Sequence, residues 1–376
     1  MAALMGGCVV VLGGCGGGGP SAPSVTWHES SLPTPAGARA LVRDASYCGG
    51  RWYVVGATST TSGETRPAVW SSTDAARWQR ARLDPGKDVF AIRDLLGSVG
   101  CSRGRIAVVG ARAGGPHGTL RTTTWRQRAD GSLVAWRAPL GLFGGVRGVK
   151  VSRLAGGPHG FLIAGTRTGG AAVWRSPDAQ AFRIEEGAPG LASTPRSGTQ
   201  GFDSVWHHGA WWVIGTATDD AGFVSAMTWT PAAGGSWTRH PVPGGASLAT
   251  AERAAETPKG LLAVGLNDHA FGAWTLSGGS WSRGSTFGRQ DPAGLEAAYV
   301  SGLAVAGNEV VASYSDGVRF RLAAAPVGGR WTDLVAPASV RVNGDHQLAV
   351  ASGAGRFLLL ADDGTRGRVW VATPPQ

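Results

Sequence analysis

The segment RWYVVG occupies residues 51–56, and closely similar segments return along the whole chain. Each consists mainly of apolar residues, and most of them follow a glycine that suits a tight turn. The others are RIAVVG (105–110), GFLIAG (160–165), AWWVIG (210–215), GLLAVG (260–265), NEVVAS (308–313) and RFLLLA (356–361). Their spacing of 48 to 55 residues predicts seven structural repeats, each with one of these segments as its second strand.

Large aromatic residues follow these segments at two further places. The first place, at the third strand of each repeat, holds Trp70, Trp125, Trp174, Trp229, Trp274, Phe320 and Trp370. The second place, at the fourth strand, holds Trp78, Trp136, Phe182, Trp237, Trp281, Trp331 and Trp27. Twelve of the sixteen Trp fall on this pattern. A carbohydrate-binding surface is the other interpretation of so many Trp, but one aromatic at a fixed place in every repeat favours packing between neighbouring repeats.

The two ends of the chain complement each other. The last repeat reaches a third strand in GRVWVATPPQ (367–376) and has no fourth, whereas SVTWHESSLP (24–33) is a strand without a repeat of its own. A four-stranded unit of about 50 residues is typical of a propeller blade. The sequence therefore predicts an all-β fold, a seven-bladed β-propeller of four-stranded blades, closed when the N-terminal strand completes the last blade, as a single domain over residues 25–376.

Composition excludes several classes of protein. The 61 Gly show no Gly-X-Y period and accompany 16 Trp, which is unlike collagen or a disordered polar chain. The formal net charge of +10 would suit nucleic acid, but the basic residues are almost all Arg and are scattered, without a cluster of five. We therefore expect no nucleic-acid partner.

The amino terminus has the pattern of an export signal. Residues 1–14 are small and apolar, too few to span a bilayer as a helix, and they lead to Leu12-Gly13-Gly14-Cys15. This resembles the lipobox of a bacterial lipoprotein, although no Lys or Arg precedes the apolar run. The resemblance implies a signal peptide over 1–15, lipidation of Cys15, a Gly/Pro/Ser tether over 16–24 and an extracytoplasmic protein held on the cell membrane by its lipid anchor. The alternative is a Gly/Ala-rich leader with two incidental Cys.

Export to an oxidising compartment would allow a disulfide. Cys48 and Cys101 lie within one position of each other when the first two repeats are aligned on their second strands. We expect these two residues, on adjacent inner hairpins, to be bonded to each other.

Two turns carry a further motif. VWSSTDAARW (69–78) and VWRSPDAQAF (173–182) resemble Asp-box repeats, which occur in sialidase-like and sortilin-like propellers and in actinobacterial secreted lipoproteins. Ser72, Asp74 and Trp78 occupy the motif in the first turn, and Ser176, Asp178 and Phe182 occupy it in the second. The motif's Gly is absent and each turn is one residue short. The resemblance implies structural turns in which the Asp side chain binds backbone N–H groups.

Alignment of the innermost strands reveals a polar ring. Counting back from each second-strand segment gives Asp44, Ser98, Arg153, Asp203, Arg253, Ser301 and Ala349. A central water-filled channel with polar walls would explain this ring. The other hypothesis is a mixed-charge ligand site formed by Asp44, Arg153, Asp203 and Arg253, together with Glu252 and Tyr299.

No motif for nucleophilic, metal-dependent or phosphate-binding chemistry occurs in the sequence. We expect no cofactor and no metal, although Asp219-Asp220 and Asp362-Asp363 could hold calcium instead of serving as turn residues. The predicted function is a monomeric, non-catalytic binding or assembly module for a protein or cell-envelope glycan. Its partner would dock on the face that carries loops 57–67, 84–94, 186–200 and 285–297. The alternative is a sialidase-like glycoside hydrolase or lyase with its site at the channel mouth.

Overall fold

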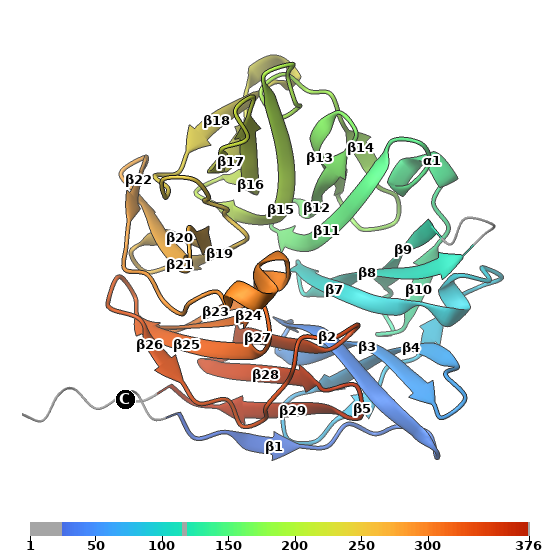
Figure 1. Cartoon of the computed structure of the whole chain (residues 1–376). Helices are drawn as coiled ribbons and strands as arrows, with labels where there is room; N and C mark the ends of the chain where they lie inside the picture. Colours follow the sequence, from blue (N-terminus) through green and yellow to red (C-terminus); the bar gives the residue numbers. More distant parts are fainter. Residues whose placement is uncertain (1–24, 115–118, 375–376) are drawn as a thin grey trace, which may run out of the picture.

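The computed structural model describes residues 25–114 and 119–374, without the side chains of residues 295–296. These residues form seven sheets arranged in a ring, and within each sheet the four main strands pair antiparallel (Figure 1). The second-strand segments all lie where the sequence predicts them. In chain order the blades are blade 1, β2 (Ala38–Cys48), β3 (Arg51–Thr60), β4 (Thr65–Ser72) and β5 (Gln79–Arg80); blade 2, β7 (Leu95–Ser102), β8 (Arg105–Gly114), β9 (Thr119–Gln127) and β10 (Leu133–Trp136); blade 3, β11 (Gly148–Gly157), β12 (Gly160–Arg167), β13 (Gly170–Ser176) and β14 (Arg183–Glu185); blade 4, β15 (Ser197–His207), β16 (Ala210–Asp219), β17 (Val224–Pro231) and β18 (Trp237–Pro241); blade 5, β19 (Arg253–Thr257), β20 (Gly260–Asn267), β21 (Ala270–Ser277) and β22 (Ser280–Arg283); blade 6, β23 (Ala298–Ala306), β24 (Glu309–Asp316), β25 (Phe320–Pro326) and β26 (Thr332–Leu334); and blade 7, β27 (Gln347–Gly353), β28 (Arg356–Asp362), β29 (Gly367–Ala372) and β1 (His28–Ser30).

Blade 7 is completed by the N-terminal strand, as predicted. β1 pairs antiparallel with β29 in the register His28↔Val371, Glu29↔Trp370 and Ser30↔Val369. β1 covers the edge of β29, which would otherwise be left unpaired in blade 7. The seven-bladed β-propeller is therefore confirmed.

A few elements lie outside the four-strand plan. A short strand β6 (Leu83–Asp84) adds to blade 2 by pairing in parallel with β10. The connections contain α1 (Leu140–Phe143) and three 3-10 turns, η1 (Ala91–Arg93), η2 (Ala233–Gly235) and η3 (Pro292–Ala297). In Figure 1, η3 (orange) lies in front of the centre of the ring. Within the described ranges, no helix has both the length and the apolar character needed to cross a membrane.

The core lies between blades. The described part of the chain has seven clusters of buried apolar side chains, and each cluster spans a single pair of neighbouring blades. A single blade has two faces and buries both of them only against its neighbours. The predicted role of the repeated aromatics in packing between repeats is thus confirmed.

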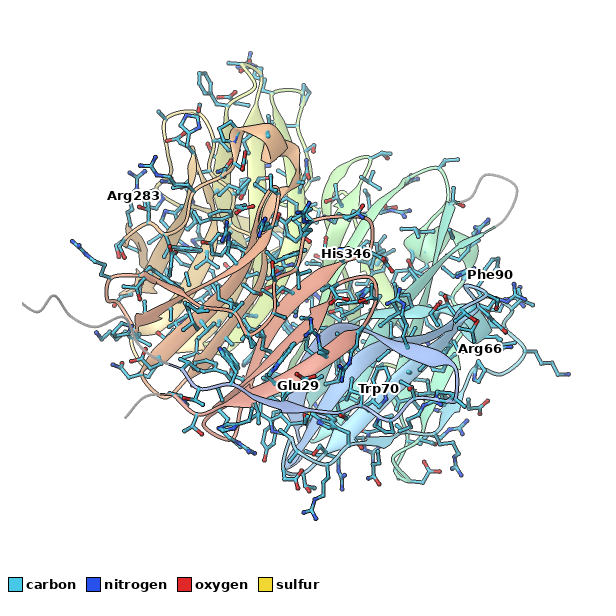
Figure 2. All side chains as sticks on the ribbon, turned by 60° about the horizontal axis from the view of Figure 1, so that its bottom comes forward. Glu29, Arg66, Trp70, Phe90, Arg283 and His346 are labelled. Atoms are coloured by element: carbon cyan, nitrogen blue, oxygen red, sulfur yellow. A yellow bond between two sulfur atoms is a disulfide. The ribbon has the colours of Figure 1, made fainter. Side chains whose placement is uncertain are left out.

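Five third-strand Trp share one hydrogen-bonding pattern. Each is fully buried and donates its indole N–H to the connection that enters its own blade, so that the connection is held against the sheet (Trp70 is labelled in Figure 2). The acceptors are Pro33 O for Trp70 (2.8 Å), Asp94 Oδ2 for Trp125 (3.0 Å), Leu142 O for Trp174 (2.8 Å), Gly190 O for Trp229 (3.0 Å) and Pro243 O for Trp274.

Two members of the predicted aromatic pattern are wrong. In the other blades the third-strand Trp pairs with the fourth residue of the second-strand segment. In blade 6 the residue that pairs with this position, Val311, is Ala324. Phe320 lies four residues earlier and pairs with Ser315. In blade 2, Trp136 ends β10, and the fully buried Leu133 takes the place that a fourth-strand Trp takes elsewhere. Both residues still pack in the core between blades, because any large apolar side chain there is shielded from water.

The Gly that ends most second-strand segments has a steric role. In blade 4 the first strand carries an extra residue between Gly201 and Asp203, and this bulge brings its backbone close to Gly215. A Cβ at Gly215 would overlap the carbonyl oxygen of Gln200. A side chain at this position is therefore excluded unless the two strands move apart.

We predict that Gly215→Ala lowers the free energy of unfolding by about 1–3 kcal/mol, because the added methyl group overpacks a closed site. Gly141→Ala is the control, since a Cβ there has no neighbour within 4 Å. Urea unfolding measures both effects. An equal and small change in the two variants would contradict the steric role of Gly215.

Candidate functional site

The structure places the six predicted ligand-binding residues on or next to the innermost strands. Asp44 lies on β2, Arg153 on β11, Asp203 on β15, Arg253 on β19 and Tyr299 on β23, and Glu252 directly precedes β19. Four of the six line a common pocket of about 310 Å³, namely Arg153, Glu252, Arg253 and Tyr299. Asp44 and Asp203 are buried behind it, at 3% and 6% exposure.

Arg153 connects the two buried aspartates. Its Nη2 donates to Asp44 Oδ1 (3.1 Å) and Oδ2 (3.0 Å), and its Nε lies 3.7 Å from Asp203 Oδ1. Burial alone would lower the pKa of Arg153, but the two carboxylates raise it. Burial raises the pKa of Asp203, and Arg153 opposes that shift. The guanidinium is therefore held charged and fixed in place.

The aspartates also connect neighbouring blades. Asp44 Oδ2 accepts the N–H of Val99 in blade 2 (3.0 Å), and Asp203 Oδ2 accepts that of Ala254 in blade 5 (3.3 Å). Ser98 Oγ accepts the N–H of Leu154 in blade 3 (3.0 Å) in the same way. These predicted ring positions thus form side-chain bonds from one inner strand to the next, which is a structural role.

Glu252 is tied down as well. Its Oε2 accepts the N–H of Val300 in blade 6 (2.5 Å), and its Oε1 accepts Thr250 Oγ1 (3.0 Å). Burial raises its pKa, whereas the Val300 N–H and Arg253 lower it. Burial likewise raises the pKa of Tyr299, the phenol on the same pocket wall.

Two cations of the pocket form no ion pair with a carboxylate whose side chain the structure describes. In residues 25–114, 119–294 and 297–374, no carboxylate lies within 4.0 Å of Lys150 Nζ or of the Arg253 guanidinium. Arg253 donates to two backbone oxygens, those of Glu252 (2.6 Å) and Ser301 (3.3 Å). The pKa of each cation is lowered, first by desolvation among protein atoms and then by a neighbouring Arg, whereas Glu252 opposes the shift in both. Lys150 keeps an exposed surface despite the surrounding protein. An anion entering the pocket would relieve this repulsion.

Sequence reasoning missed Lys150 and Phe202, which also line the pocket. Lys150 Nζ lies 5.6 Å from the centroid of the Phe202 ring. Phe202 is the extra residue of the bulge in β15, one place before the predicted Asp203. The alignment considered one position per strand, and a bulge turns the neighbouring position toward the pocket.

The two Asp-box-like turns bind their own backbone. Asp74 Oδ1 accepts the N–H groups of Ala76 (2.9 Å) and Arg77 (2.8 Å) and the Ser72 hydroxyl (2.9 Å). The Arg77 N–H is the main reason why the pKa of Asp74 is far below its usual range. Trp78 Nε1 donates to Ser30 Oγ of β1 (2.9 Å), so this turn also holds the closing strand.

The second turn is similar but looser. Asp178 Oδ1 accepts the N–H of Gln180 (2.9 Å) and the hydroxyl of Ser176 (3.4 Å), and Phe182 is buried at 4% exposure. The side chains act within the fold in both turns. Neither turn presents a reactive group to the pocket.

The structure joins Cys48 and Cys101 by a disulfide, with their Cα atoms 5.5 Å apart, between the inner hairpins of blades 1 and 2. Cys15, with the signal peptide and the tether, lies outside the described residues. In residues 25–114 and 119–374 no group of three or more His, Cys, Asp or Glu is arranged to hold a metal ion. Asp219 and Asp363 cap turns, each accepting two backbone N–H groups.

Comparisons with known proteins support the fold. No family model matches the sequence, and none of the curated proteins compared with it does. Among solved structures, the chain is similar to the β-propeller domain of the Trilobed protease from Pyrococcus furiosus, described as having an open velcro topology, at 10% identity and a TM-score of 0.50, with 89% of this chain and 93% of that chain covered.

Two further structures are similar at lower TM-scores. A protein of unknown function from Dyadobacter fermentans has 14% identity and a TM-score of 0.46, with 94% of this chain and 100% of that chain covered. The phage phi92 endosialidase has 11% identity and a TM-score of 0.48, with 94% and 70% covered. Likenesses at these identities say nothing about activity.

Proposed function

We propose that the protein is an extracytoplasmic lipoprotein, anchored through Cys15, whose propeller is a non-catalytic binding or assembly module. Its partner is a protein or cell-envelope glycan, and the channel pocket takes an anionic group of that partner. The observation that carries the proposal is the presence of Lys150 and Arg253 in one pocket, where neither forms an ion pair with a carboxylate of residues 25–114, 119–294 or 297–374.

The placement of exposed apolar side chains supports docking on one face. All eight large apolar side chains that are exposed in the described residues lie in, or within two residues of, connections from second to third strands or from one blade to the next. They are Val89, Leu120, Leu140, Val146, Val149, Phe223, Val318 and Val335. The pocket residues Lys150, Arg253 and Tyr299 lie near the start of their strands, toward this same face. These eight side chains are spread over several blades, so they indicate the face on which a partner would dock and do not define one continuous apolar patch.

We predict that Lys150→Glu weakens binding of acidic ligands at least about ten-fold, because it replaces attraction in a partly desolvated pocket by repulsion. The Lys150 side chain contacts the Phe202 ring and takes part in none of the ion pairs formed within the part of the chain that the structure describes. Lys87→Glu gives the same charge change on an exposed loop. An array of uronate-, sulfate- and phosphate-bearing glycans and acidic peptides, probed with the purified protein, measures the effect. Equal binding by both variants, or no acidic ligand bound by wild type, would refute the pocket.

One observation favours the alternative function, a sialidase-like hydrolase. Tyr299 and Glu252 line the same pocket as Arg153 and Arg253, which are residue types that this enzyme class uses. Fluorogenic sialosides and glucuronides test it with wild type and Tyr299→Phe. Turnover that Tyr299→Phe abolishes would support hydrolysis, and its absence at high protein concentration would support binding.

A further inference from the structure

A second groove lies on the opposite face of the ring, between blades 3 and 4. It has a volume of about 1090 Å³ and is bordered by the β11–β12 and β15–β16 hairpins and by the turn from β13 to β14. We propose that this groove binds a pyranose polysaccharide, through stacking on Trp206 and hydrogen bonds from the β13–β14 turn. The proposal is independent of the channel pocket, because the two share no lining residue.

The wall of the groove is aromatic. The ring centroids of Trp206 and Trp211 are 5.4 Å apart in an edge-to-face arrangement, and those of His159 and Trp206 are 5.1 Å apart. Trp211 and Phe161 are buried, whereas Trp206 is half-buried and His159 is exposed. Trp211 and Phe161 therefore form the floor of the groove, and Trp206 and His159 form an accessible wall. An accessible indole offers a flat apolar face with a negative quadrupole, which suits the C–H face of a sugar ring.

The position of Trp206 is fixed by its pairing with Trp211 and by Gly157 of the neighbouring blade. Trp206 pairs with Trp211 across the hairpin of blade 4, and a Cβ at Gly157 of blade 3 would lie 3.1 Å from both side chains. The absence of a side chain at Gly157 lets the two indoles pack against blade 3. Trp206 and Trp211 also stand outside the aromatic pattern that forms the repeated core, so that pattern does not account for them.

The opposite wall is polar and largely neutralised. Arg175 lies 3.3 Å from Glu185, whose other oxygen accepts the Trp237 N–H (2.7 Å). Gln180 and Arg183 are exposed on the same wall. Sugar hydroxyl groups bind to hydrogen-bond donors and acceptors of this kind and do not require a net charge. A neutral sugar chain therefore fits this groove better than it fits the cationic channel pocket.

Blade 1 provides an internal comparison. Tyr47 and Trp52 occupy the equivalent hairpin positions, with centroids 5.2 Å apart, and Tyr47 packs on Gly353 of blade 7 as Trp206 packs on Gly157. Trp52 is completely buried, and neither residue lines this groove. Tyr47→Leu therefore removes an equivalent aromatic without touching the proposed site.

Co-sedimentation of the purified protein with insoluble cellulose, xylan, mannan and chitin tests the proposal, in about 0.5 M NaCl so that charge attraction is screened. Wild type, Tyr47→Leu and Lys150→Glu are expected to bind at least one of these polysaccharides alike. Trp206→Leu, which keeps apolar packing and loses the aromatic face, is expected to bind about ten-fold more weakly. If its thermal unfolding shows that Trp206→Leu does not fold, the double variant Gln180→Ala/Arg183→Ala on the exposed wall decides.

The proposal is overturned if wild type binds none of the four polysaccharides, or if the folded groove variant binds as well as wild type does. The Lys150→Glu arm separates the two sites. Loss of binding in Lys150→Glu alone would assign the polysaccharide to the channel pocket and so also overturn the groove.

Discussion

Replacing Trp174 by alanine is expected to lower the free energy of unfolding by about 3–5 kcal/mol, the usual cost of deleting a large buried aromatic. Trp174 has no exposed surface and packs in the cluster between blades 2 and 3. Its indole N–H also holds α1 through Leu142 O, at 2.8 Å. The substitution removes the interface packing and leaves that carbonyl without its donor.

Chemical unfolding, followed by the loss of far-ultraviolet ellipticity, measures this cost. Trp174→Phe keeps most of the buried area and loses the hydrogen bond, and we expect it to cost about 1 kcal/mol. Trp136→Ala is the matched control, since Trp136 is only half-buried and lies off the repeated position. Equal losses for Trp174→Ala and Trp136→Ala would contradict the register described for blade 2.

The second large effect concerns Asp94 and pH. Asp94 is completely buried, and its Oδ2 accepts Thr123 Oγ1 and Trp125 Nε1, whereas Oδ1 has no partner among the described residues. Burial raises the pKa of Asp94 from its ordinary 3.8 to about 7, and the two hydrogen bonds only partly oppose this. The carboxylate takes the place that a backbone carbonyl has in the other four Trp contacts.

The sign of the pH dependence follows from the raised pKa. Between about pH 4 and pH 7 the folded state binds a proton that the unfolded state releases, so stability falls as the pH rises through this range and levels off above it. The full difference is about 4 kcal/mol for such a shift. Asp94→Asn keeps an acceptor for Thr123 and Trp125 and cannot ionise.

We therefore expect Asp94→Asn to match wild type near pH 4 and to be more stable by about 4 kcal/mol at pH 8. Urea unfolding at several pH values between these limits measures the difference. The exposed Asp220→Asn serves as control, with a difference from wild type that does not change with pH. A constant difference for Asp94→Asn would show that Asp94 is ionised throughout.

The sequence repeats predict the fold, but they do not predict the register in which the strands pair. Seven second-strand segments and the orphan strand at 24–33 are sufficient to predict a closed ring, because each is a local pattern that recurs. Phe320 and Trp136 are assigned to the wrong positions because the number of residues between the second strand and the aromatic varies with turn length. A large apolar side chain is also buried at either register, so its presence does not reveal the pairing. Only the pairing of strands distinguishes Ala324 from Phe320.

The candidate site was predicted in part, because some of its residues lie at a position that recurs in every repeat and others do not. Arg153 and Arg253 share a pocket because one alignment position recurs on the channel side of the inner strands. Glu252 and Tyr299, which line the same pocket, lie one and two residues before that position in their blades. Asp44 and Asp203 have the same alignment position, yet they turn toward the next blade and bind its backbone. Lys150, Phe202 and Asp94 depend on a bulge or on a neighbouring element, and no local pattern in the chain signals either.

The closing strand also sets an order of events. β1 is made first by the ribosome, but its partner β29 is made last, more than 330 residues later. Until then its row of backbone groups has to stay unpaired while other sheets form nearby. With three residues, His-Glu-Ser, it is too short and too polar to compete for their edges. We therefore expect completion of blade 7 to be the last step of folding, slow because it joins the most distant parts of the chain.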